Sequence, residues 1–238
     1  MTDSSTAAEN PHQNVSFPSN GGTAHGYLAV PEGGSGPGLV VIQEWWGLTE
    51  HIKDVTDRFA REGFVALAPD LYGGATTHDS DEAGQLMQEL PVTKAATDLA
   101  GAVDFLLQHE AVTSSTVGAV GFCMGGGFVL VLAAQQGDRV GAAVPFYGVG
   151  GYDQVDLGGI TAPVLGHFGT EDGFAAPEQV DALEAELHEK AKGPVEIVRY
   201  EGAGHAFFND ENHLGTYDAD KAAQAWARTL EFLRANVR

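Results

Sequence analysis

Short, unbroken apolar runs recur along this chain, and stretches with the period of a helix separate them. Leu39-Val40-Val41-Ile42 is one such run, and the apolar positions that follow it from Ile52 to Ala60 fall on one side of a helix. Unbroken apolar strands are typical of a parallel sheet that is buried on both faces. The alternation therefore predicts an α/β fold, in which a mostly parallel, doubly wound sheet carries helices on both faces.

The other predicted elements continue this alternation to the end of the chain. We expect a hairpin of strands at 15–17 and 24–30, then strands at 64–68, 116–121, 140–145, 163–168 and 196–200. We expect helices at about 80–89 and 94–109, from Met124, at about 177–191 and at 219–236. No repeat or linker divides the sequence, so we predict a polar tail over 1–14 and one domain over 15–238.

The charge balance narrows the range of partners. Asp and Glu number 33 against 12 Lys and Arg, which gives a net charge of −21. Such a surface repels phosphate backbones and anionic membranes, so we expect neither nucleic acid nor membrane as a partner. The start of the chain resembles no signal peptide, and the single cysteine excludes an intramolecular disulfide. We expect a cytoplasmic monomer or homodimer that acts on a small molecule.

A glycine-rich turn follows the strand predicted at 116–121. Gly121-Phe122-Cys123-Met124-Gly125 has the strand–turn–helix pattern of a nucleophile elbow, with cysteine in the position of the usual serine. Glycine two residues before and after the centre allows the strand and helix to approach closely. The turn would raise the thiol of Cys123 to a helix N-terminus, where the amide of Met124 could stabilise an oxyanion.

Two further groups complete a catalytic arrangement. Asp172 and His205 each follow a predicted strand, so the order nucleophile, acid, base is that of the α/β-hydrolase fold. Glu171 is the alternative acid, beside the preferred Asp172. The loop after the strand at 39–42 would supply a second oxyanion amide from Trp45. The carboxylate of Glu44 would lie in the same crevice, where its negative charge opposes a thiolate.

With these pieces in place, the sequence resembles the dienelactone hydrolase family, also called carboxymethylenebutenolidases. The matching pieces, which cover nearly the whole chain from about residue 15, are Gln43–Gly47, Ala68–Tyr72, Gly121–Gly126, Gly169–Asp172 and Gly204–Asn209. The resemblance implies a Cys-His-Asp triad of Cys123, His205 and Asp172. It also assigns Glu44 to control of the thiol, and the amides of Trp45 and Met124 to the oxyanion hole.

The chain departs from that family at the substrate. Members that act on dienelactone hold its carboxylate with two arginines, but Asn209 occupies one of these positions and no arginine occurs between Arg61 and Arg139. Lys94 is the only cation of that stretch. We therefore expect a pocket for neutral esters or lactones. Its candidate residues are Trp46, Tyr72, Phe122, Tyr147, Phe207, Phe208 and Asn209, with Trp45 and Phe174 nearby.

The predicted function is cysteine-dependent hydrolysis of an ester or lactone through an acyl-enzyme on Cys123, without cofactor or metal. A thioesterase or peptidase on the same triad is an alternative. A catalytically silent binding module on the same scaffold is another. A zinc or sensing site of Cys123, His205, Asp172 and His167 is the least favoured, because no pair has close ligand spacing.

Overall fold

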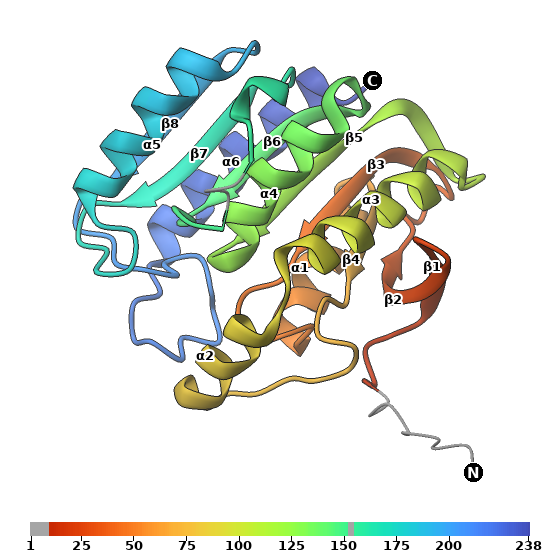
Figure 1. Cartoon of the computed structure of the whole chain (residues 1–238), viewed down its shortest axis with the longest axis horizontal. Helices are drawn as coiled ribbons and strands as arrows, with labels where there is room; N and C mark the ends of the chain where they lie inside the picture. The colour runs from red at the N-terminus through yellow and green to blue at the C-terminus, as the bar shows by residue number, and fades with distance from the viewer. Residues whose placement is uncertain (1–9, 152–154) are drawn as a thin grey trace.

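The computed structural model describes residues 10–151 and 155–238 of the chain (Figure 1). Within these residues, eight strands form one sheet in the order β1-β2-β4-β3-β5-β6-β7-β8. The pairs β1–β2 and β2–β4 are antiparallel, and every other pair is parallel. The predicted α/β-hydrolase fold, with a mostly parallel sheet, is confirmed.

The strands and helices follow the predicted order, although β3 and β5 begin earlier than predicted. The strands are β1 (Val15–Ser19), β2 (Gly22–Ala29), β3 (Gly36–Ile42), β4 (Val65–Pro69), β5 (Val112–Phe122), β6 (Val140–Phe146), β7 (Val164–Gly169) and β8 (Val195–Tyr200). The helices are α1 (Glu50–Arg61), α2 (Ser80–Glu89), α3 (Val92–Gln108), α4 (Met124–Gln136), α5 (Pro177–Lys190) and α6 (Ala219–Asn236), with short 3-10 turns at Gly137–Arg139 and Leu157–Gly159. None of the helices described has the length and apolar character to cross a membrane.

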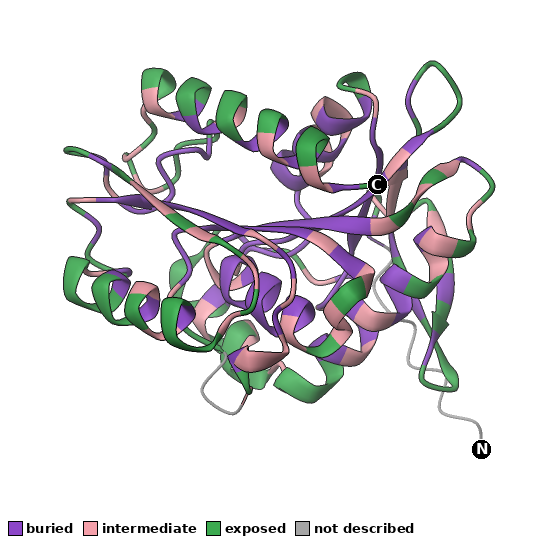
Figure 2. Ribbon diagram, turned by 90° about the horizontal axis from the view of Figure 1, so that it is seen from above, coloured by how far each residue is buried: buried purple, intermediate pink, exposed green. Residues whose placement is uncertain are grey.

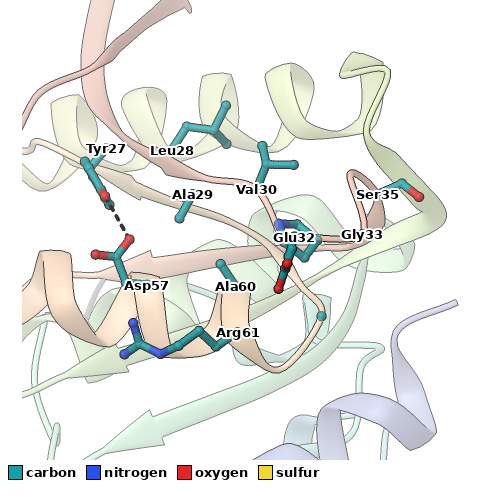
Figure 3. Close-up of a pocket in the computed structure, with 12 residues that line it drawn as sticks. Tyr27, Leu28, Ala29, Val30, Glu32, Gly33, Ser35, Asp57, Ala60 and Arg61 are labelled. Atoms are coloured by element: carbon teal, nitrogen blue, oxygen red, sulfur yellow. Dashed lines mark hydrogen bonds between the residues drawn. The ribbon is translucent and has the colours of Figure 1, made fainter.

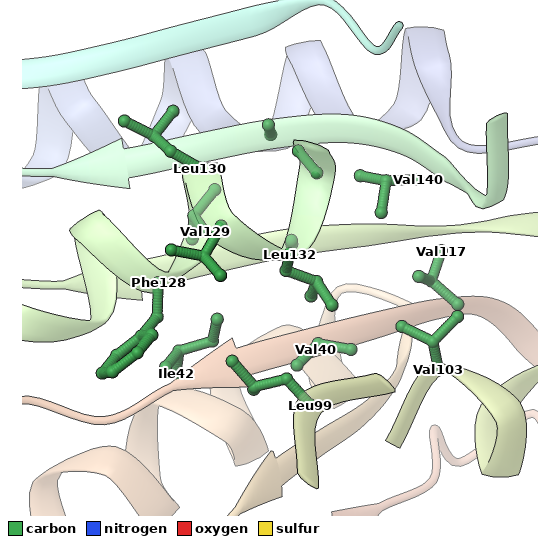
Figure 4. Packing of buried hydrophobic residues seen from close by; sticks show 14 of the residues in the cluster. Val40, Ile42, Leu99, Val103, Val117, Phe128, Val129, Leu130, Leu132 and Val140 are labelled. Atoms are coloured by element: carbon green, nitrogen blue, oxygen red, sulfur yellow. The ribbon is translucent and has the colours of Figure 1, made fainter. Parts of the chain in front are cut away.

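The sheet lies between two helical layers, as Figure 2 shows by its buried central strands. Alternate side chains of β3 point to opposite layers because successive residues of a strand face opposite ways. Val40 and Ile42 pack in the core that α3, α4 and α5 cover, where Figure 4 shows them beside Leu99 of α3. Leu39 and Val41 belong to the second core, under α1 and α6. Both faces of the sheet are therefore buried, which explains the unbroken apolar runs of its strands.

The first part of the chain is attached to the domain earlier than predicted. Residues 1–9 of the expected tail lie outside the described residues. Asn10 is buried, and its side-chain amide donates to the carbonyl of Leu48 at 3.1 Å. Gln13 donates to a carboxylate oxygen of Asp70 at 2.7 Å. The folded unit therefore begins before residue 15, because short polar side chains fasten this segment to the loops at 48 and 70.

The carboxyl ends of β3, β5, β7 and β8 lie on one edge of the sheet because these strands are parallel. The loops that follow them carry residues 43–47, 123, 170–173 and 201–209. Open α/β sheets bind their ligands at this edge. The topology therefore gathers the predicted site residues in one place.

Candidate active site

Cys123 lies at a strained turn between β5 and α4. Its backbone has φ 54° and ψ −118°. Residues other than glycine rarely adopt a positive φ. A Cβ on Gly121 would lie 2.2 Å from the carbonyl oxygen of Gly125, and one on Gly125 would lie 2.5 Å from the carbonyl oxygen of Ile42. Glycine is therefore required at both positions, and the half-buried Cys123 projects from the N-terminus of α4.

The same close approach brings the β3 loop against the elbow. A Cβ on Gly125 would also lie 2.5 Å from the carbonyl oxygen of Gln43, so the end of β3 and the start of the loop after it pass beside the first turn of α4. The amide of Met124 is in that turn, where N–H groups have no helical acceptor. The amides of Trp45 and Met124 thus belong to two segments in contact, as an oxyanion hole requires.

Asp172 and His205 form a buried pair. Nδ1 of His205 lies 2.8 Å from Oδ2 of Asp172, while Oδ1 accepts hydrogen bonds from the amides of Phe174 at 2.7 Å and Ala175 at 2.8 Å. Burial opposes ionisation of Asp172, but these hydrogen bonds outweigh it and lower its pKa. The neighbouring Glu171 is exposed. The structure therefore pairs the histidine with Asp172, the preferred acid.

The other ring nitrogen of His205 is left free by Asp172. Nε2 is buried and has no hydrogen-bond partner within the described residues, yet the thiol of Cys123 is close enough to influence the charge of the ring. Burial lowers the pKa of His205, but the hydrogen bond with Asp172 and the proximity of Cys123 raise it to about 10. A protonated His205 would stabilise negative charge on the sulfur.

Glu44 is buried at the end of β3, and its hydrogen bonds go to residues other than Cys123. Tyr147 donates its hydroxyl to Oε1 at 3.3 Å, and Asn209 donates from Nδ2 to Oε2 at 2.6 Å. Burial and the negative charge of Glu44 raise the pKa of Tyr147. The ring of Tyr147 lies 5.1 Å from that of His205. Glu44 is therefore connected to His205 through Tyr147.

A cavity of about 500 Å³ opens over this group. Cys123 and His205 both line it, together with the predicted aromatic residues Tyr147 and Phe174. The rest of its lining is mostly apolar and consists of Met87, Gln88, Leu90, Val92, Met124, Phe128, Gly148, Val149, Gly150, Gly151 and Gln179. The thiol of Cys123 and the imidazole of His205 therefore face the same mostly apolar cavity.

Several residues predicted to line the pocket lie elsewhere. Phe122, Phe207 and Phe208 are buried in the second core, where the rings of Phe122 and Phe208 stack at 5.2 Å. Phe122 is the last residue of β5, and Phe207 and Phe208, in the loop after β8, belong to the same core. The expectation that they line the cavity was therefore wrong.

Trp46, Tyr72 and Asn209 also lie outside the cavity lining. Trp46 is buried and packs against the rings of His78 and His213. The hydroxyl of Tyr72 donates to the sulfur of Met124 at 3.5 Å, and burial together with the nearby Cys123 raises the pKa of Tyr72. Asn209 turns toward Glu44 because a buried carboxylate needs a donor.

The sequence reasoning missed the wall that covers the cavity. Met87 and Gln88 belong to the last turn of α2, while Leu90 and Val92 lie at its junction with α3. The loop at 148–151 forms another part of the lining. The adjacent apolar residues Leu86 and Met87, near the end of a mostly polar helix, were the available signal.

His167 does not join the other residues of the alternative zinc site, and a second cavity lacks the residues of the candidate site. His167 is buried and bonds to Tyr200 at 2.9 Å and Thr229 at 3.1 Å, so it does not join Cys123. A cavity of about 600 Å³ lies between β2 and α1 (Figure 3). Its lining includes Tyr27, which donates to Asp57 at 2.8 Å, but no cysteine or histidine.

The fold and the elbow at Cys123 place the protein in the α/β-hydrolase class. Residues 24–237 match the model of the dienelactone hydrolase family, and the chain belongs to that family. It is thus a hydrolase of ester or lactone bonds.

Individual proteins of similar sequence align with nearly the whole chain. "Protein usf" of Aquifex pyrophilus is 36% identical over 93% of this chain and 97% of its own length. A protein of Aquifex aeolicus named "Putative carboxymethylenebutenolidase" is 32% identical over 95% of this chain and 99% of its own. The crystal structure of a "Putative Dienelactone Hydrolase" from Klebsiella pneumoniae superimposes with a TM-score of 0.83 at 31% identity, over 92% of this chain and 96% of that one.

Proposed function

We propose that the protein is a cysteine-dependent hydrolase that cleaves neutral esters or lactones through an acyl-enzyme on Cys123. One observation carries the proposal. Cys123 and His205 line the same cavity, and Nδ1 of His205 lies 2.8 Å from Oδ2 of Asp172. A nucleophile, a base and an orienting acid in this relation are the requirements of covalent acyl transfer.

In the first half of the reaction, the sulfur of Cys123 attacks the carbonyl carbon of the substrate. His205 already holds the thiol proton, in keeping with its raised pKa, and Asp172 stabilises this imidazolium through Nδ1. The amides of Trp45 and Met124 donate to the oxyanion of the tetrahedral intermediate. When this intermediate collapses, His205 returns its proton to the departing alkoxide, and a thioester remains on Cys123.

The second half uses the same groups in the opposite sense. His205, now neutral, removes a proton from a water molecule, and the hydroxide attacks the thioester carbon. Collapse of the second tetrahedral intermediate expels the sulfur of Cys123 and releases a carboxylic acid. For a lactone, both products of ring opening are parts of one molecule.

The lining of the cavity supports a neutral substrate. Apart from His205, the lining contains no cationic side chain, and the position of one family arginine holds Asn209. Lys94, the nearest candidate for a substitute, is bonded to Asp98 at 2.6 Å. A carboxylate entering this cavity would lose hydration without gaining a partner, which is unfavourable.

A hydrolysis screen tests the proposal. Purified protein and Cys123→Ala would be assayed on p-nitrophenyl esters, lactones, thioesters, peptides and dienelactones. We expect turnover of neutral esters or lactones, and none by the variant. Faster turnover of a thioester or peptide than of any ester would favour those alternatives. No turnover at all, together with binding of an apolar ligand, would favour the silent module.

A further inference from the structure

Three potential metal ligands lie close together on the surface, beside Trp46 of the loop after β3. His78 lies in the loop between β4 and α2, whereas Glu211 and His213 lie in the loop between β8 and α6. One ligand atom from each lies within 4.8 Å of the other two. The two loops are separated by more than half of the sequence, so only the fold brings these side chains together.

The geometry of the three groups suits a small cation. Nε2 of His213 lies 3.0 Å from Oε2 of Glu211, and the rings of His78 and His213 lie 4.4 Å apart. Ligands on a tetrahedral zinc ion are about 3.3 Å apart, because zinc–nitrogen and zinc–oxygen distances are near 2.0–2.1 Å. The present spacing requires only small side-chain movements to reach that value.

The surroundings favour a cation and leave room for water. The side chains of His213 and Glu211 are 31% and 27% exposed, so a bound ion would keep an open position toward solvent. Trp46 packs against both imidazole rings, at 6.5 Å from His78 and 5.9 Å from His213, and restricts their orientation. The net charge of −21 attracts cations to the whole surface.

We propose that His78, Glu211 and His213 form a binding site for a divalent transition metal of the zinc type, apart from the catalytic cavity. Two imidazoles and one carboxylate are a ligand set that zinc uses with a water in the fourth position. The ion would join the loop that begins α2 to the loop that follows His205. The amide of Glu211 donates to Asn209 at 3.0 Å, so the bound ion would also steady the partner of Glu44.

The site is tested by titrating ZnCl₂ into the full-length Cys123→Ala protein after chelator treatment, using calorimetry in a salt-containing buffer. Removing the thiol prevents zinc from binding at the triad, and salt suppresses weak binding to the acidic surface. The same titration is repeated with His78→Ala, His213→Ala and Glu211→Gln added. His188→Ala is the matched control, since His188 also lies near a carboxylate, that of Glu184 at 3.9 Å, without a second histidine.

We expect one zinc ion per chain. Each of the three variants should bind zinc at least ~10-fold more weakly than the parent. The control should bind as tightly as the parent. Zinc should also raise the Tm of the parent but not that of His78→Ala, because only a folded site binds the ion. The proposal is overturned if the parent shows no saturable binding, or if His78→Ala and His213→Ala bind as well as the control.

Discussion

Asn209 donates a hydrogen bond from its side-chain nitrogen to Oε2 of Glu44 at 2.6 Å, and both residues are buried. The oxygen of the same amide accepts from the backbone of Glu211. A neutral amide therefore donates to the carboxylate of Glu44. The resemblance noted in the sequence implies an arginine at this position in relatives that cleave dienelactone.

Replacing Asn209 with Asp tests how closely Glu44 depends on that amide. The change removes a hydrogen bond to a charged group, about 1.5–3 kcal/mol, and places two carboxylates together. We expect the free energy of unfolding at pH 7 to fall by at least ~2 kcal/mol in denaturant titrations. Asn236→Asp, at the half-buried end of α6, is the control. Equal stability of Asn209→Asp and the wild type would show that Glu44 does not need its donor.

Cys123→Ala should lower kcat by several orders of magnitude, because the variant has no nucleophile. His205→Ala should cost a similar amount, and the double variant little more, since the members of a triad act as a unit. Steady-state kinetics on a p-nitrophenyl ester measure all three. Near-normal turnover by Cys123→Ala would refute the acyl-enzyme.

Glu44→Gln should speed alkylation of Cys123 by iodoacetamide near neutral pH. Glu44 reaches the triad through Tyr147, and its negative charge opposes a second negative charge on the nearby sulfur. Alkylation rates between pH 6 and 9 would be compared with those of Glu231→Gln, an exposed residue of α6. Equal rates in the wild type and both variants would remove Glu44 from the control of the thiol.

Neutral esters should be cleaved faster than dienelactones that carry a carboxylate. Each missing arginine–carboxylate hydrogen bond is worth about 1.5–3 kcal/mol, so the loss of two corresponds to roughly 10²- to 10⁴-fold in kcat/KM. Saturation kinetics on matched neutral and anionic substrates would measure the difference. If dienelactone gave the highest kcat/KM, then Lys94→Ala would show whether that lysine has replaced the arginines.

The buried His167 should make stability depend on pH. Burial, assisted by the charge of Arg228, lowers its pKa from 6.5 to about 3. The unfolded chain therefore binds a proton between pH 6.5 and 3 that the folded chain does not. In this window the free energy of unfolding falls by about 1.4 kcal/mol for each pH unit of acidification, from this residue alone.

His167→Gln isolates that contribution. The amide of glutamine offers both a donor and an acceptor to Tyr200 and Thr229, but it does not titrate. Urea titrations between pH 6.5 and 4 should therefore give a shallower pH dependence for the variant than for the wild type. Parallel curves would mean that His167 takes up its proton in the folded state.

The order of elements, the elbow at Cys123 and the pairing of Asp172 with His205 were predictable because each left a signal in the sequence. Apolar runs marked the strands, and glycines marked the elbow where backbones nearly touch. β3 and β5 extend further toward their N-termini than predicted, since Gly36 and the polar residues after Val112 carry no apolar pattern. Pairing of Asp172 with His205 followed from chain order and parallel strands alone.

The pocket was less predictable because core and cavity use the same residue types. Phe207 and Tyr147 are both fully buried aromatic residues, but only Tyr147 reaches the cavity, from a backbone at φ 39°. No period or motif separates such residues. The meeting of His78 with His213 has no sequence signal either, because their proximity depends on how two distant loops fold back over Trp46.

Helix α2 has a consequence for how this enzyme could change over evolutionary time. Of its ten residues only Ala83 is buried, yet its last turn supplies part of the cavity wall. A segment with so few buried contacts opens at small cost in free energy, and substitutions there scarcely affect global stability. New substrate shapes can therefore arise by mutation of this wall, while the sheet that carries Cys123 and His205 is inherited unchanged.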